Sequence, residues 1–134
     1  MLFFKGGRKK RFESRTRLID QEISQSKRFE HNFSILAIEI SDSVPRGLSK
    51  ILPGKTISYH VLEKNLRLYD QIISSSYRKY YVLLPQTDEN AVQAVMKRIQ
   101  RLAEQHDWGN ISIRSASYPK DGDNSKALLD KLSE

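Results

Sequence analysis

The sequence predicts an α/β sandwich, in which helices flank one mostly antiparallel central sheet. The segment Phe33–Ile40 is almost continuously apolar, as in a strand that is buried on both faces. Two further strand patterns, Gln71–Ser75 and Tyr80–Leu84, are close enough in sequence to form a hairpin. These strands alternate with amphipathic helix patterns along the chain, and that order predicts a sheet with helices packed on its faces.

The remaining elements follow from periodicity and from turn-forming residues. Segment 41–54 contains prolines and glycines and is expected to be largely connecting. Ile111–Ser117 alternates apolar and polar residues, which predicts a half-exposed strand. Four helices are expected, at Arg17–Phe29, at Lys55–Leu68, from a cap within Thr87–Asn90 to about His106, and at Ser125–Leu132. In the third helix, the predicted core stripe is Ala91, Val95, Met96, Ile99 and Leu102.

Composition limits the classes of function. The 134 residues are enough for one domain, predicted at 17–134 after a basic N-terminal segment at 1–16. The absence of cysteine excludes disulfides and thiolate metal sites, and it favours a cytoplasmic location. The net charge of +7 suggests an anionic partner. The basic N-terminal segment could be a solvated end, or it could make a weak contact with an anionic membrane.

Two groups of residues stand out, and each also has an ordinary structural explanation. Arg67 and Asp70 could form a common i,i+3 ion pair at a helix end. The tyrosines at 77, 80 and 81, beside Arg78 and Lys79, could form a stacking platform for nucleic acid. Strand alternation places Tyr80 and Tyr81 on opposite faces, so at least one of them is expected in the core, and a nucleic-acid partner is not favoured. The three histidines lack metal-ligand spacing.

The ordered set of motifs from Arg17 to Leu132 resembles a GGDEF (diguanylate cyclase) domain. An Arg-x-x-Asp pair, Arg67 and Asp70, stands before the hairpin, with five residues between Asp70 and the turn. Leu83-Leu84-Pro85 follows the hairpin, and the segment from Ser115 to Gly122 comes in the family's order. The resemblance implies the palm-like fold of nucleotidyl cyclases.

The turn departs from the family's signature. The family uses two glycines and then acidic side chains that hold two magnesium ions, and magnesium requires oxygen ligands. Here Tyr77 adds bulk, and Arg78 and Lys79 place positive charges where carboxylates are needed. Glu39 alone remains at a metal-ligand position of the family. The sequence therefore predicts no catalytic residues, no metal and no cofactor, with a degenerate signature at Ser76, Tyr77, Arg78, Lys79 and Tyr80.

The residue types of the family's inhibitory site, by contrast, are present in this sequence. The resemblance implies that Arg67 and Asp70 bind cyclic di-GMP with Arg98 from the following helix. It also implies that Arg28 is a candidate for the arginine often supplied by a neighbouring domain. Arginine can donate two hydrogen bonds to guanine O6 and N7. The expected function is a catalytically inactive receptor in bacterial second-messenger signalling, with a protein partner or a homodimer. The alternatives are an interaction scaffold that has lost nucleotide binding, and residual nucleotidyl chemistry.

Overall fold

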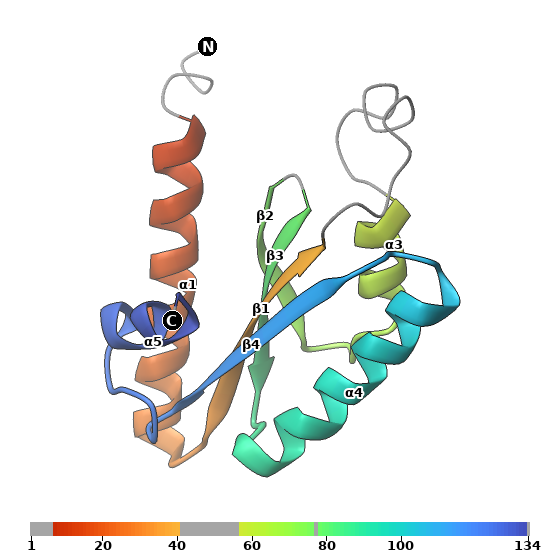
Figure 1. Cartoon of the computed structure of the whole chain (residues 1–134). Helices are drawn as coiled ribbons and strands as arrows, with labels where there is room; N and C mark the ends of the chain where they lie inside the picture. Colours follow the sequence, from red (N-terminus) through yellow and green to blue (C-terminus); the bar gives the residue numbers. More distant parts are fainter. Residues whose placement is uncertain (1–6, 41–56, 77, 134) are drawn as a thin grey trace.

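The central feature of the fold is a four-stranded antiparallel sheet in the order β2-β3-β1-β4 (Figure 1). The computed structural model describes residues 7–40, 57–76 and 78–133. The strands are β1 (Phe33–Ile40), β2 (Gln71–Ser76), β3 (Lys79–Pro85) and β4 (Ile111–Tyr118). The predicted fold class is confirmed, and β1 has the bounds that its apolar run predicted.

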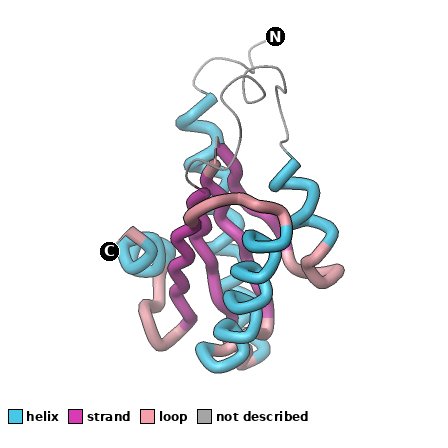
Figure 2. The backbone as a smooth tube through the Cα atoms, turned by 45° about the vertical axis from the view of Figure 1, so that its right-hand side comes forward, coloured by secondary structure: helices cyan, strands magenta, loops and turns pink. Residues whose placement is uncertain are grey.

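Helices cover both faces of the sheet. Figure 2, in which the helices are cyan and the strands magenta, shows helical segments on either side of the sheet. Among the described residues these helices are α1 (Gly7–Phe29), α3 (Ile57–Lys64), α4 (Glu89–Gln105) and α5 (Ser125–Leu132). Residues of α1 and α5 pack with one set of inward side chains, including Ile35 and Ala116. Residues of α3 and α4 pack with the other set, including Leu36 and Val82.

Strand β1 holds the two cores together because its alternating side chains enter both. It pairs with β3 on one side and with β4 on the other. Only Glu39 of its eight residues is exposed. Ser34 is fully buried within this strand, and its hydroxyl donates to the carbonyl of Thr87 at 2.8 Å and contacts the Ser117 hydroxyl at 2.8 Å. These bonds satisfy a polar group that would otherwise destabilise the core.

Capping residues set where two of the helices begin. The Asp88 side chain accepts hydrogen bonds from the backbone N–H groups of Asn90 and Ala91, and that of Asn124 accepts from Ala127. Both arrangements satisfy N–H groups that have no partner within the helix. The predicted start of α4 and the bounds of α5 are therefore confirmed.

Three expectations about the helices need correction. Helix α1 begins at Gly7 rather than at Arg17, because strong helix formers continue it without an apolar pattern. Helix α3 ends at Lys64 rather than at Leu68. On α4, Val92 is buried where Ala91 was expected, and Ala91 is exposed. Segment 41–54 lies outside the described residues, and the division at residue 16 stays a prediction.

Candidate functional site

Arg67 and Asp70 are brought together in the loop between α3 and β2. The Arg67 Nε donates to Asp70 Oδ2 at 3.0 Å, and its Nη2 donates to Oδ1 at 2.9 Å. The backbone N–H of Arg67 also donates to Oδ2, at 3.0 Å. This is a bidentate arginine–carboxylate ion pair, and its two parallel hydrogen bonds make it stronger than a pair with one hydrogen bond.

The same guanidinium ties this loop to the connection between β3 and α4. Its Nη2 donates to the Thr87 hydroxyl at 2.6 Å and to the Pro85 carbonyl at 3.3 Å. The Thr87 hydroxyl in turn donates to the Pro85 carbonyl at 3.0 Å. The loop is thus held to the end of the neighbouring strand as well as by its own ion pair.

Burial separates the roles of the two partners. The Asp70 side chain is 0% exposed, whereas that of Arg67 is 38% exposed. Because both carboxylate oxygens accept from Arg67, Asp70 acts here as an internal anchor. The hydrogen bond with Asp70 is the main cause that raises the pKa of Arg67 above its ordinary value. The guanidinium therefore stays charged and points in a fixed direction.

An exposed apolar surface lies beside this arginine. Leu68 is 100% exposed and Tyr69 is 58% exposed, whereas most large apolar side chains of the described residues are at least partly buried. The Arg67 guanidinium lies 4.8 Å from the centre of the Tyr69 ring. The loop thus presents a charged donor, an aromatic face and an aliphatic side chain together, a combination that suits a planar heterocycle or an apolar protein surface.

The other two arginines of the predicted site lie elsewhere. Arg98 is exposed on α4, ten residues beyond the cap Asp88. That separation corresponds to about 15 Å along the helix axis. Arg28 is in the last turn of α1, and its guanidinium lies 5.5 Å from the Phe29 ring. Helices α1 and α4 pack on opposite faces of the sheet, and no contact between Arg28 and Arg67 is recorded among the described residues.

The hairpin turn carries the degenerate signature. Ser76 and Lys79 are paired residues at the strand ends, and Arg78 between them has a positive φ of 63°. Tyr77 lies outside the described residues. Tyr80 is buried, and its hydroxyl contacts the Ser58 hydroxyl of α3 at 2.6 Å. Tyr80 is therefore a core residue, as strand alternation predicted for one member of the Tyr80–Tyr81 pair.

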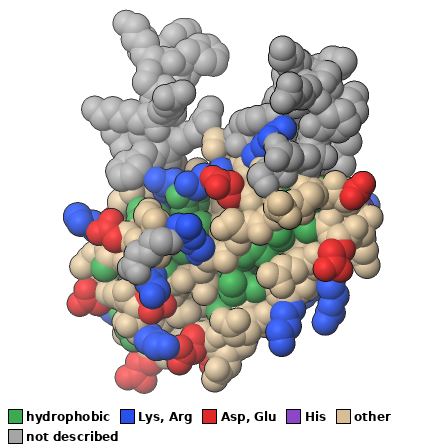
Figure 3. Space-filling view, viewed as in Figure 1, with side chains coloured by type: hydrophobic (Ala, Val, Ile, Leu, Met, Phe, Trp, Pro, Cys, Tyr) green, Lys and Arg blue, Asp and Glu red, His purple; other side chains and the backbone are tan. Residues whose placement is uncertain are grey.

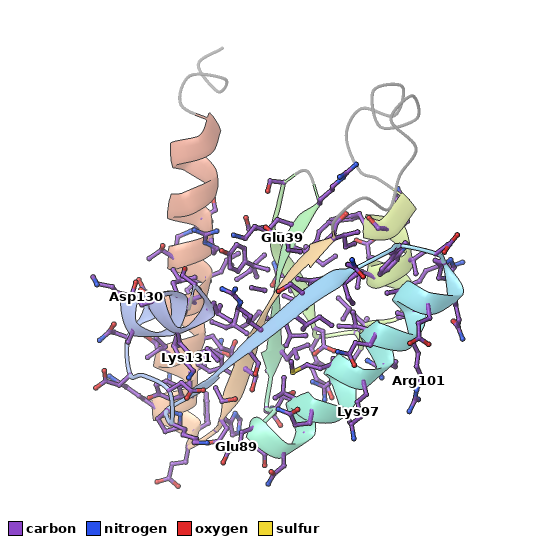
Figure 4. All side chains as sticks on the ribbon, in the orientation of Figure 1. Glu39, Glu89, Lys97, Arg101, Asp130 and Lys131 are labelled. Atoms are coloured by element: carbon purple, nitrogen blue, oxygen red, sulfur yellow. The ribbon has the colours of Figure 1, made fainter. Side chains whose placement is uncertain are left out.

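Cations gather around the other tyrosine, on the opposite face. The Arg15 guanidinium from α1 lies 4.3 Å from the centre of the Tyr81 ring, and Lys79 Nζ lies 5.6 Å from it. Glu39 is paired with Lys79 across the β1–β3 ladder. In Figure 4 it is the one labelled acid near that end of the sheet. This end of the molecule therefore suits an anion better than a cation.

The donor set does not fit the magnesium pair that the fold family implies. A pair of magnesium ions needs several oxygen ligands, mainly carboxylates and phosphates. Within the described ranges, no group of three or more histidine, aspartate or glutamate side chains could hold a metal. At the turn, Glu39 stands opposite a lysine, and a cation placed there would be repelled by that ammonium group.

Thr87 is a site residue that the sequence pattern did not single out as one. The segment Thr87–Asn90 indicated only a helix start, and that prediction is correct because Asp88 is the cap. No local pattern shows that the hydroxyl of Thr87 contacts a guanidinium 20 positions earlier in the chain. The exposure of Leu68 and Tyr69 was also missed, because Leu68 was the last residue of the predicted second helix and Tyr69 followed it directly.

Comparisons with known proteins show the fold. No family profile and no curated protein matches this sequence. Among solved structures, a DGC protein from Thermotoga maritima is similar with a TM-score of 0.71 at 16% identity, covering 87% of each chain. A sensory box/GGDEF family protein from Caulobacter crescentus gives 0.65 at 15% identity, covering 90% of this chain and 86% of that one.

A third structure contains a nucleotide. It is the GGDEF domain of DgcB from Caulobacter crescentus in complex with c-di-GMP, with a TM-score of 0.64 at 9% identity, covering 88% of this chain and 75% of that chain. These likenesses show that the chain has the fold of GGDEF domains. Within the described part of the chain, no helix combines the length and apolar character needed to span a bilayer.

Proposed function

We propose that this GGDEF-fold domain is a non-catalytic receptor for cyclic di-GMP, and that its ligand binds at the Arg67 loop. The observation that carries the proposal is the fixed orientation of a partly exposed guanidinium. Asp70 and Thr87 hold Nε and Nη2 of Arg67, and Nη1 is the guanidinium nitrogen that neither of them contacts. A pre-oriented arginine loses little conformational entropy when it binds, which favours affinity.

Guanine is the chemical group that fits this arrangement. Its O6 or N7 can accept a hydrogen bond from Nη1 of Arg67, the guanidinium nitrogen that Asp70 and Thr87 do not hold. Its ring can stack on an exposed aromatic side chain, and Tyr69 lies beside Arg67. Asp70 is a positioning residue in this proposal because it is buried against Arg67. In this proposal Arg98 supplies a second cation from α4, and Arg28 remains a candidate for a further one.

The proposal of catalytic inactivity rests on the turn. Arg78 and Lys79 occupy positions where phosphoryl transfer by this fold requires carboxylates, and Lys79 stands opposite Glu39. Incubation with GTP and magnesium or manganese should give no cyclic di-GMP. Detectable turnover by the purified protein, lost when Glu39 is changed to glutamine, would contradict this part of the proposal. The cytoplasmic location expected from the sequence accords with a nucleotide messenger as ligand.

Calorimetric titration with cyclic di-GMP tests the receptor function. We expect micromolar or tighter binding that is lost in Arg67→Ala and weakened in Arg98→Ala. Arg101→Ala is the matched control, because Arg101 is an exposed arginine on the same helix and points away from the sheet (Figure 4). Equal binding by the Arg67→Ala variant would refute the assignment of the ligand to this loop.

A second candidate function is a protein scaffold without nucleotide binding. It is favoured by the full exposure of Leu68, since a fully exposed leucine beside a half-exposed tyrosine is an apolar patch at a loop tip. If the titration shows no binding, the same patch is the surface to test. A Leu68→Ser variant should then lose a protein partner that the parent chain retains.

A further inference from the structure

The sheet has an edge whose backbone is available for pairing. Strand β4 stands last in the order β2-β3-β1-β4, and its recorded strand partner is β1. The hydrogen bonds of Ser117 show which backbone groups of β4 point away from β1. Its N–H donates to Asp121 Oδ2 at 2.8 Å, and its carbonyl accepts from the Asp121 N–H at 2.7 Å. Ser117 therefore turns its backbone groups away from β1.

Alternation extends this orientation along the strand. In an antiparallel ladder every second residue directs its N–H and C=O to the same neighbour. The backbone N–H and C=O groups of Ile111, Ile113 and Ser115 therefore point away from β1, as those of Ser117 do. The backbone groups of the residues between them bond to β1. Within the part of the chain that the structure describes, no hydrogen bond reaches the backbone groups of these three residues. Asp121 closes one end of the edge and leaves the other end open.

Apolar side chains flank the open part of the edge on the α4 side. Ile111 and Ile113 are half-buried and pack against the core that α4 covers, as Met96 of α4 does. Figure 3 shows green side chains along the line between β4 and α4, on the surface that faces the viewer. A strand added beside β4 could place alternate side chains over this apolar line.

The opposite side of the same edge is polar and carries a cation. Ser112 and Arg114 are exposed, and they are the partners of Glu39 and Ala37 across the ladder. Arg114 makes one weak bond, from Nη1 to the Leu132 carbonyl at 3.3 Å, and it forms no ion pair within the described ranges. A carboxylate on an added strand could therefore pair with it.

We infer that the β4 edge accepts an extended segment of a partner protein, in which apolar residues alternate with acidic ones. The segment would add a fifth strand to the sheet, a known mode of peptide recognition. Its apolar side chains would face Ile111, Ile113 and Met96, and an acidic side chain would face Arg114. A second copy of this chain is a poorer occupant, because it would bring a net charge of +7 against the same charge.

This inference does not depend on the proposed receptor function. The Arg67 loop precedes β2, which stands at the other edge of the sheet. Variants of β4 can therefore be compared with variants of the loop in the same protein. Loss of cyclic di-GMP binding in Arg67→Ala and loss of peptide binding in a β4 variant are separate results.

The test uses two short blocked peptides, one alternating valine with glutamate and the other valine with lysine. We expect the glutamate peptide to bind the full chain, and the lysine peptide to bind about tenfold more weakly or not at all. Amide hydrogen exchange measured by NMR should slow at Ile111, Ile113 and Ser115 when the glutamate peptide is present. Unchanged exchange at these three amides would overturn the inference, even if the peptide binds.

Two variants locate the contact. Ser115→Pro removes an outward N–H without removing a bond to β1, and Ser115→Ala is its matched control because it keeps that N–H. The proline variant should bind the glutamate peptide about tenfold more weakly than the alanine variant. Equal affinity in the two variants would show that the edge is not used.

Charge reversal covers the case in which the proline variant does not fold. Arg114→Glu should lose the glutamate peptide and gain the lysine peptide, whereas Arg101→Glu, which makes the same charge change on the outer face of α4, should keep the parent preference. An unchanged preference in Arg114→Glu would overturn the acidic character of the partner. Sedimentation that shows a dimer of the parent chain, lost in Ser115→Pro, would instead assign the edge to a second copy.

Discussion

Arg67 and Thr87 are joined by a 2.6 Å hydrogen bond that links the loop after α3 to the start of α4. The residues are 20 positions apart in sequence, and the contact adds to the ion pair between Arg67 and Asp70. An exposed i,i+3 pair by itself stabilises a protein little. Because the carboxylate of this pair is fully buried and the guanidinium has further acceptors, this pair has a larger structural role.

Thr87→Val tests that role, since valine keeps the shape of the side chain and removes the hydroxyl. We expect the free energy of unfolding to fall by about 1 kcal/mol, as Arg67 loses one acceptor and the Pro85 carbonyl loses a donor. Denaturant titration measures the change. The double variant with Arg67→Ala should show a non-additive effect; fully additive effects would mean that the bond contributes nothing.

Tyr80→Phe should destabilise the protein by about 1 kcal/mol, because it removes the buried contact with the Ser58 hydroxyl. Tyr81→Phe is the matched control. It lies on the adjacent position of the same strand, and no hydrogen bond of its hydroxyl is recorded among the described residues. Thermal unfolding of both variants gives the comparison. Equal melting temperatures would show that the Tyr80 hydroxyl does not stabilise the fold.

The positive φ of 63° at Arg78 predicts how this turn position responds to substitution. Glycine adopts this backbone region readily, whereas β-branched residues do so at a cost. Arg78→Gly should therefore have a free energy of unfolding about 1–2 kcal/mol higher than that of Arg78→Val. Both variants lack the arginine side chain and its contacts, so loss of that side chain cannot explain the difference between them.

Glu22 predicts a pH dependence of stability. Burial raises the pKa of this carboxyl above its usual value, and the nearby His31 partly opposes the shift. The folded state therefore binds a proton more readily than the unfolded state does. The resulting stabilisation is present when the pH is below the pKa that Glu22 has in the unfolded protein. It is lost as the pH rises through the higher pKa that Glu22 has in the folded protein.

Glu22→Gln should consequently gain stability relative to the parent as the pH is raised from about 4 to 7. The difference is expected to be small, because the side chain is only half-buried. Urea unfolding at several pH values measures it. Asp20→Asn, which removes a negative charge from an exposed position of the same helix, is the control and should show no such gain.

Periodicity predicted the elements that pack through a regular apolar pattern. The eight residues of β1 and the eight of α5 were found at their predicted bounds, since each has a continuous apolar or capped pattern. The end of α3 was wrong because residues 65–70 are held by the hydrogen bonds of Arg67, which have no periodicity. The extra turns of α1 were missed because residues 7–16 have no repeating apolar pattern.

The candidate site was predictable only where its members are local. Arg67 and Asp70 are three positions apart, and the structure joins them as expected. Sequence could not show that Asp70 is fully buried and therefore serves Arg67, because burial depends on how the loop packs on other elements. It could not place Arg28 either, since the face that α1 covers is set by the topology of the sheet.

The strand order has a consequence for how this domain can hold two partners at once. Strands β2 and β4 are the two edges, so three inter-strand spacings, about 14 Å, separate them. A nucleotide at the loop before β2 and a peptide along β4 would therefore not touch. Occupancy of one edge should leave affinity at the other unchanged. Such a domain would work as an adaptor that brings messenger and protein together, rather than as a switch.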